Sequence, residues 1–188
     1  MSHTIQGHSF TIKSTGGLLK SLTCQIEIFQ PGTPISTRIA AIWDTGASST
    51  VITEDVVRNL GLVPTGMVQN HTAGGTINSN TYLVSIGLPN KVKINGVSVS
   101  SVPRLSGGKI DALIGMDIIT MGDFSITNYQ GHTCMTFRIP SLHEIDYTSN
   151  PNLILKPMPF IAPPKIQKNS LCTCGSGRKF KNCCGQLP

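Results

Sequence analysis

The stretch that most constrains the fold is A-I-W-D-T-G-A-S-S-T, residues 41–50. The apolar run 39–43 predicts a buried strand, and Gly46 with the small residues 47–49 predicts a tight turn at its end. Asp44 is therefore carried from the interior onto a turn with little side-chain bulk around it. A partly desolvated carboxylate costs free energy unless it is paired or used. An ordinary turn between two strands is the alternative, because Asp-Thr-Gly alone is a weak signal.

The rest of the first 139 residues predicts an all-β, barrel-like domain with two short helices. Gly, Pro and Asn separate the short apolar or alternating segments. An Asn-Gly pair at 95–96, flanked by apolar triplets, predicts a tight hairpin turn. We expect two strands, 8–14 and 18–29, around a Gly-Gly turn, and a hairpin at 67–88. Further strands are expected at 36–44, 92–94, 97–99, 110–114, 124–127 and 134–139. Two helices are expected, at 53–60 and 116–121.

Two separated motifs resemble one known family. The loop Asp44-Thr45-Gly46-Ala47-Ser48 is similar to the active-site loop of aspartic peptidases, and Ala after Gly is typical of the retropepsins. A second motif, Leu113-Ile114-Gly115, resembles the element that this family folds against its catalytic loop. Trp43 departs from the family, which more often has an aliphatic residue there. The resemblance implies a single-lobe retropepsin-like acid protease barrel over residues 1–139, with Asp44 catalytic.

The tip of the hairpin at 67–88 contains Thr72, Ala73, Gly74 and Gly75. Consecutive glycines permit positive φ and wide motion. This segment is either an ordinary exposed hairpin or, as the resemblance implies, the flap that closes over a substrate. His71 beside it is interpreted as a surface residue rather than a catalyst.

The chain changes character after residue 139. Six prolines in residues 140–168 predict a semi-rigid linker. In 169–188 the cysteines follow the pattern C-x-C, eight residues, then C-C, which suits a tetrahedral zinc site formed by Cys172, Cys174, Cys183 and Cys184. This stretch resembles the SEC-C zinc-binding motif. Four thiolates leave no open position on zinc, so the metal would be structural. Two disulfides or a disordered tail are the alternatives.

Charge is distributed unevenly along the chain. Residues 1–146 contain nine Lys or Arg and nine Asp or Glu, so the net charge of +6 comes from the remainder. Nucleic acid is therefore an unlikely partner of the barrel, whereas the basic tail could bind an acidic protein. No apolar run is long enough to span a membrane, and no secretory signal is evident. We expect a cytoplasmic protein with reduced or metal-bound cysteines.

Asp-Thr-Gly occurs once, whereas the aspartic mechanism needs two carboxylates. The resemblance therefore implies a homodimer in which two copies of Asp44 activate a water against a peptide bond, with no cofactor for catalysis. By the same resemblance, Thr45 would lock the two loops together, and Gly46 and Ser48 would contact the backbone of a protein or peptide substrate. The motifs H-E-x-x-H and G-x-S-x-G are absent. The alternative function is a non-catalytic protein that keeps this fold and recruits a partner through the zinc module.

Overall fold

The computed structural model describes residues 6–72, 75–149, 167–172 and 176–183. The chain divides into two compact units, Met1–Glu144 and Ile145–Pro188. The elements of the first unit are β1 (His8–Lys13), β2 (Thr23–Phe29), β3 (Ser36–Trp43), β4 (Val51–Thr53), α1 (Glu54–Leu60), β5 (Gly66–Thr72), β6 (Gly75–Gly87), β7 (Lys93–Val102), η1 (Ser106–Gly108), β8 (Ala112–Ile114), α2 (Met116–Ile119), β9 (Asp123–Thr127), η2 (Tyr129–Gly131) and β10 (Cys134–Ile139).

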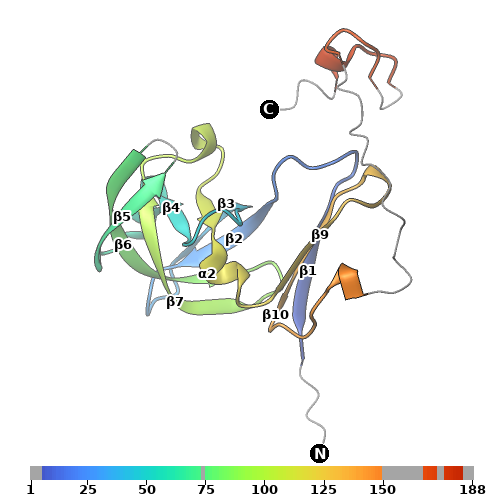
Figure 1. The fold of residues 1–188 in the computed structure, drawn as a ribbon. Helices are drawn as coiled ribbons and strands as arrows, with labels where there is room; N and C mark the ends of the chain where they lie inside the picture. The colour runs from blue at the N-terminus through green and yellow to red at the C-terminus, as the bar shows by residue number, and fades with distance from the viewer. Residues whose placement is uncertain (1–5, 73–74, 150–166, 173–175, 184–188) are drawn as a thin grey trace, which may run out of the picture. The chain divides into compact units, whose positions relative to one another are not determined.

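Six strands close into a barrel in the order β2-β3-β8-β4-β7-β6, because β6 also pairs with β2 (Figure 1). Strand β5 is added to the outer edge of β6. Buried Ile and Val side chains from all six strands fill the interior, and Ile28, Ile52, Val84 and Ile114 are wholly inaccessible to solvent. Alternating patterns in the sequence place these side chains on one face of each strand. The prediction of an all-β barrel with few helices is confirmed.

Both predicted helices are present. Helix α1 begins after Thr53 and ends at Gly61, whose φ of 57° gives the left-handed cap that glycine favours. Helix α2 is a single turn that begins after Gly115. In the part of the chain that the structure describes, no helix has the length and apolar character needed to cross a bilayer.

The first strand does not form the predicted hairpin with the second. β1 pairs with β10 in a separate three-stranded sheet, β1-β10-β9, which lies beside the barrel (Figure 1). β2 begins only at Thr23. An aromatic cluster joins this sheet to the barrel: Trp43 contacts Phe10, Phe124 and Phe137, with ring centroids 5.0–5.8 Å apart. Trp43, the departure from the family pattern, thus anchors the end of β3 against the sheet.

The prediction of a hairpin turn at Asn95-Gly96 is wrong. β7 continues through both residues, and its pairing with β6 shifts register where Val84 faces Val97 and Ile86 faces Ile94. The pair therefore forms a bulge, with Gly96 at φ 69°. Continuous pairing of β7 with β6 is favoured over a local turn because it buries Ile94, Val97 and Val99. The actual turn between β6 and β7 lies at residues 88–92.

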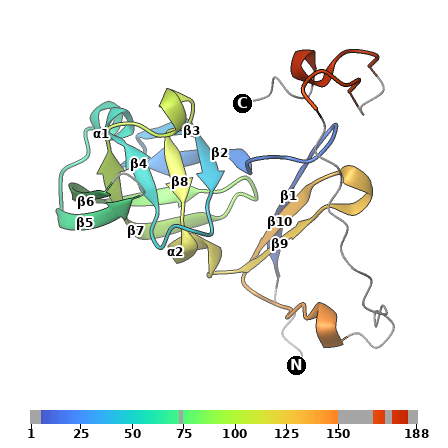
Figure 2. The same ribbon diagram turned by 45° about the horizontal axis from the view of Figure 1, so that its top comes forward.

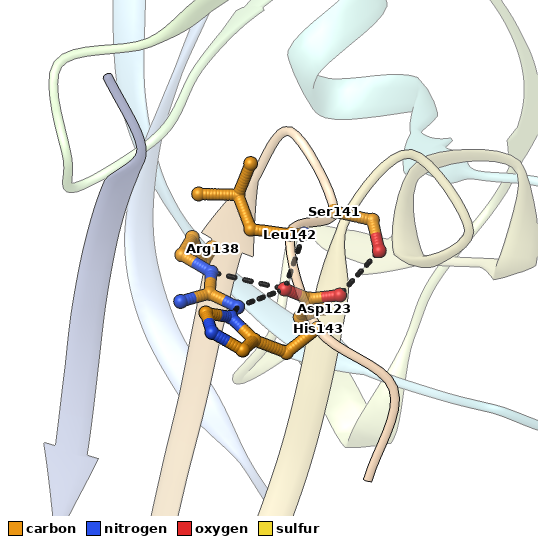
Figure 3. Close-up of polar contacts among 5 residues, drawn as sticks. All are labelled: Asp123, Arg138, Ser141, Leu142 and His143. Atoms are coloured by element: carbon orange, nitrogen blue, oxygen red, sulfur yellow. Dashed lines mark hydrogen bonds and ion pairs between the residues drawn. The ribbon is translucent and has the colours of Figure 1, made fainter. Parts of the chain in front are cut away.

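A polar cluster closes the end of the three-stranded sheet (Figure 3). Arg138 of β10 donates two hydrogen bonds to Asp123 of β9, and its guanidinium also meets Nδ1 of His143 at 2.6 Å. The Leu142 backbone N–H and the Ser141 hydroxyl donate to the same carboxylate. These bonds from Ser141, Leu142 and Arg138 hold the pKa of Asp123 well below its usual range. The first unit therefore includes residues just beyond 139, the boundary expected from the sequence.

Candidate active site and cysteine module

Asp44 lies immediately after β3, where that strand runs parallel to β8. Its backbone N–H donates to the carbonyl oxygen of Ile114 at 3.0 Å, and its Oδ1 accepts the Gly46 N–H at 2.8 Å. The second bond is an Asx-type turn, which the glycine and small residues of the loop permit. In the single chain Asp44 is half-buried, whereas Thr45, Gly46 and Ser48 are exposed. The loop thus presents one carboxylate and several backbone groups at the surface of the barrel.

The start of α2 supports this loop from below (Figure 2). The Met116 N–H donates to the Ala47 carbonyl at 2.8 Å, and the Asp117 N–H donates to the Ser48 carbonyl at 3.2 Å. A Cβ at Gly115 would lie 2.6 Å from the carbonyl carbon of Ser49, so no larger residue fits without moving the loop. The structure therefore brings together residues 44–48 and 113–115, the two sets that the sequence singled out.

Sequence analysis missed two residues that hold the loop, Thr50 and Asp117. Thr50 is fully buried, and its N–H and hydroxyl donate to the two carboxylate oxygens of Asp117 at 2.9 and 2.8 Å. The Thr50 oxygen in turn accepts the Gly115 N–H at 3.2 Å. The only sequence signal is their position: Thr50 is the last residue of the stretch 41–50, and Asp117 follows Gly115 by two residues. Asp117 is half-buried, and these hydrogen bonds to its carboxylate fix the return of the loop into β4.

The hairpin predicted as a flap is formed by β5 and β6, with Thr72 opposite Gly75 in the register. Gly75 has φ 115°, which glycine adopts without strain. Ala73 and Gly74 lie outside the described residues. At the base of the hairpin, the Asn70 side chain donates to Ser100 Oγ at 3.0 Å and so ties β5 across β6 to β7.

Cys24, in β2, is half-buried and lies beside Trp43. The indole Nε1–H of Trp43 donates to its sulfur at 3.2 Å. Burial nevertheless raises the pKa of the Cys24 thiol, so this cysteine stays neutral and has no nucleophilic character at neutral pH.

In the second unit the two described segments of the cysteine module, 167–172 and 176–183, are joined by backbone hydrogen bonds. Leu171 bridges to Lys179, and the Cys172 N–H donates to the Arg178 carbonyl at 2.7 Å. Cys183 follows the short η5 helix (Phe180–Asn182), and its N–H donates to the Phe180 carbonyl. Cys172 is buried and Cys183 half-buried. The other two predicted ligands, Cys174 and Cys184, lie outside the described residues.

Comparison with known proteins bears on both parts of the chain. A family model described as aspartyl protease matches residues 31–118, and the SEC-C motif matches residues 169–186. The protein translocase subunit SecA of Polynucleobacter necessarius is 54% identical over 33 residues, which are 18% of this chain and 4% of that protein. SecA of Clostridium tetani is 59% identical over 32 residues, 17% of this chain and 4% of SecA. The chain thus spans about 4% of the length of these curated relatives.

Two solved structures are similar to the first part of the chain. A retropepsin-like aspartic protease from Rickettsia conorii has 16% identity and a TM-score of 0.45, covering 73% of this chain and 99% of its own. The retroviral protease-like domain of Ddi1 from Leishmania major has 15% identity and a TM-score of 0.36, covering 65% and 95%. At such scores the fold assignment rests on the strand pairing described above. Both resemblances predicted from the sequence are confirmed: residues 31–118 match the aspartyl protease family model, residues 169–186 match the SEC-C motif, and the similar solved structures are retropepsin-like proteins.

Proposed function

We propose that the protein is an aspartic endopeptidase that acts as a homodimer, with Asp44 of each copy forming one half of the catalytic dyad. The observation that carries this proposal is the geometry of the Asp44 loop. The chain has one Asp-Thr-Gly, and the carboxylate sits half-exposed on a loop that residues 113–117 hold by backbone hydrogen bonds. A second copy related by a two-fold axis would supply the missing carboxylate through the same surface.

The chemistry follows from two carboxylates about 3 Å apart, which cannot both ionise and therefore share one proton. The ionised carboxylate takes a proton from a water, and the oxygen of that water attacks the scissile carbonyl carbon. The protonated carboxyl donates its proton to the carbonyl oxygen. Transfer of a proton to the amide nitrogen then lets the C–N bond break. Thr45 would join the two loops, Gly46 and Ser48 would bind the substrate backbone, and residues 72–75 would close over it. Ala47 would leave the dyad without a further hydroxyl donor.

The cysteine module would hold one structural Zn²⁺ through Cys172, Cys174, Cys183 and Cys184. The donor set fits, because zinc favours four thiolates and the turn that pairs Cys172 with Arg178 returns the chain toward Cys183. The metal would stabilise the module and take no part in peptide cleavage. We further propose that the first unit, the proline-rich segment that follows it up to residue 168 and the module 169–188 are separate parts of a cytoplasmic protein, and that the basic module docks on an acidic partner.

The test is cleavage of a mixed peptide library by the full chain, read by mass spectrometry. Asp44→Asn keeps the shape of the loop but removes the acid, so cleavage should fall by roughly a thousandfold or more. Asp55→Asn is the matched control, because Asp55 is an exposed carboxylate on α1. Equal cleavage by Asp44→Asn, or no cleavage by a wild-type protein shown to be dimeric, would reject the proposal and favour a non-catalytic binding protein.

A further inference from the structure

A concave surface lies on the outside of the barrel, away from the Asp44 loop. It is a cavity of about 620 Å³ between β2, β3 and the β6–β7 turn, and its lining includes Glu27, Phe29, Arg38, Lys91 and Lys93. Arg38 precedes Asp44 by six residues on one extended strand, so the two lie about 20 Å apart. This basic groove, as we call it, is therefore distinct from the candidate active site.

The groove has three cations and one carboxylate. Glu27 Oε1 accepts a hydrogen bond from the Ser36 hydroxyl at 2.7 Å. Among the described residues, no ion pair joins Glu27 to Arg38, Lys91 or Lys93. Unpaired cations around a concavity create a positive potential that attracts anions. The barrel as a whole has no net charge, so this potential is local.

The position of Lys93 is set by a contact with an aromatic ring. The Lys93 ammonium lies 3.7 Å from the centre of the Phe29 ring. The ring packs against Gly87, where a Cβ would lie 3.1 Å from a carbon of the ring. Cation–π contact of this kind holds the ammonium over the groove.

The turn that carries Lys91 is also held in place. Its backbone closes through hydrogen bonds between residues 88, 91 and 92, and Asn90 donates to the His8 carbonyl at 2.9 Å. Lys91 has φ 64°, a conformation that a non-glycine residue adopts at a cost. Lys91 lines the groove from this backbone conformation, so its charge is placed there at some cost in backbone stability.

We propose that the basic groove binds an acidic, extended segment of a polypeptide. At Glu27–Phe29, where β2 lines the groove, both edges of the strand are already paired, with β3 and with β6. An occupant there cannot add to β2 as a further strand and is recognised through its side chains. Carboxylates spaced along a peptide match three cations spread over two strands and a turn. A peptide substrate carrying such a segment outside its cleavage site would be held at two places, which raises its effective concentration at Asp44.

The test is direct binding of a fluorescein-labelled hexaglutamate peptide to the full chain carrying Asp44→Asn, followed by fluorescence anisotropy. Without catalysis the result is independent of the proposed peptidase activity. The double variant Lys91→Gly, Lys93→Gln should weaken binding by roughly tenfold, and binding should weaken between about 50 mM and about 300 mM salt. The control pair Lys13→Gln, Lys109→Gln removes equal charge elsewhere and should leave affinity within about twofold.

Lys91→Gly separates binding from folding, because glycine relieves the positive φ. That single variant should bind the peptide more weakly while melting no lower than its parent. The proposal is overturned if hexaglutamate does not bind, or if the control pair weakens binding equally. It is also overturned if only neutralising Arg178, Lys179 and Lys181 in the tail abolishes binding, or if an oligothymidylate of equal charge binds more tightly than the peptide.

Discussion

The barrel and the cysteine module differ in what can hold them folded. The barrel encloses a continuous apolar core from six strands, extended by the aromatic cluster around Trp43. Among the described residues of the module, Cys172 is the only buried side chain, and Phe180 is half-buried. A stretch so short cannot bury enough apolar surface to offset its conformational entropy. The stability of the barrel should therefore depend on packing and not on zinc. The stability of the module should depend on zinc and not on packing.

A large effect on the barrel is expected from Gly115→Ala. The new methyl group would meet the Ser49 backbone at 2.6 Å, and a backbone neighbour cannot move without shifting the Asp44 loop. We expect a loss of about 3 kcal/mol or more in the free energy of unfolding, together with loss of peptide cleavage. Urea denaturation measures the first. Gly16→Ala is the control, since no atom lies within 4 Å of its Cβ. Equal stability of the two variants would refute the packing account.

A smaller loss is expected from Thr50→Val. The variant keeps the shape of Thr50 but removes its hydroxyl. The buried Gly115 N–H then loses its acceptor, and the Asp117 carboxylate loses one of its donors. Unsatisfied buried groups of this kind cost about 1–3 kcal/mol. Thr127→Val, at an exposed position of β9, should change stability by less than about 0.5 kcal/mol. If both variants unfolded at the same urea concentration, the hydrogen bonds of Thr50 would have no role in holding the loop.

Asp123→Asn should have a still smaller effect, and one that depends on pH. The pKa of Asp123 is lowered in the folded chain, so its ionised form stabilises the fold above its unfolded pKa of about 3.9. That stability is lost as pH falls toward the folded pKa. The variant should therefore melt below wild type at pH 7, and the difference should narrow below about pH 4. A constant difference in melting temperature across this range would contradict the assigned role of the carboxylate.

Removal of zinc should have the smallest effect on the barrel. Chelation, or Cys172→Ser with Cys174→Ser, should abolish zinc content and the amide protection of the module, while the melting temperature of the barrel stays within about 1 °C. Cys134→Ser, in β10, is the control that should keep the metal. Metal analysis and calorimetry of the full chain measure both responses. A barrel transition that falls with chelation would show that the two regions fold as one.

The sequence predicted the elements whose pattern is local. The strand ending at Trp43, the turn after it and the cap at Gly61 follow from apolar runs and glycine positions. Pairing between distant segments did not follow, as for β1 with β10, because nothing in one strand specifies its partner. At Asn95-Gly96 the local sequence favours a turn, but β7 continues through both residues because this buries core side chains. The Thr50–Asp117 network was also missed, because hydrogen bonds over 67 residues have no periodicity to read.

The central claim, that two copies of Asp44 act together, is tested most directly by mixing subunits. Wild-type protein is incubated with a ninefold excess of Asp44→Asn protein until subunit exchange is complete, and cleavage of a short peptide is measured per wild-type chain. If the dyad spans a dimer, most wild-type chains become trapped with an inactive partner and activity falls roughly tenfold. Undiminished activity, with exchange verified by mass spectrometry, would show that a single chain is sufficient and would contradict the account.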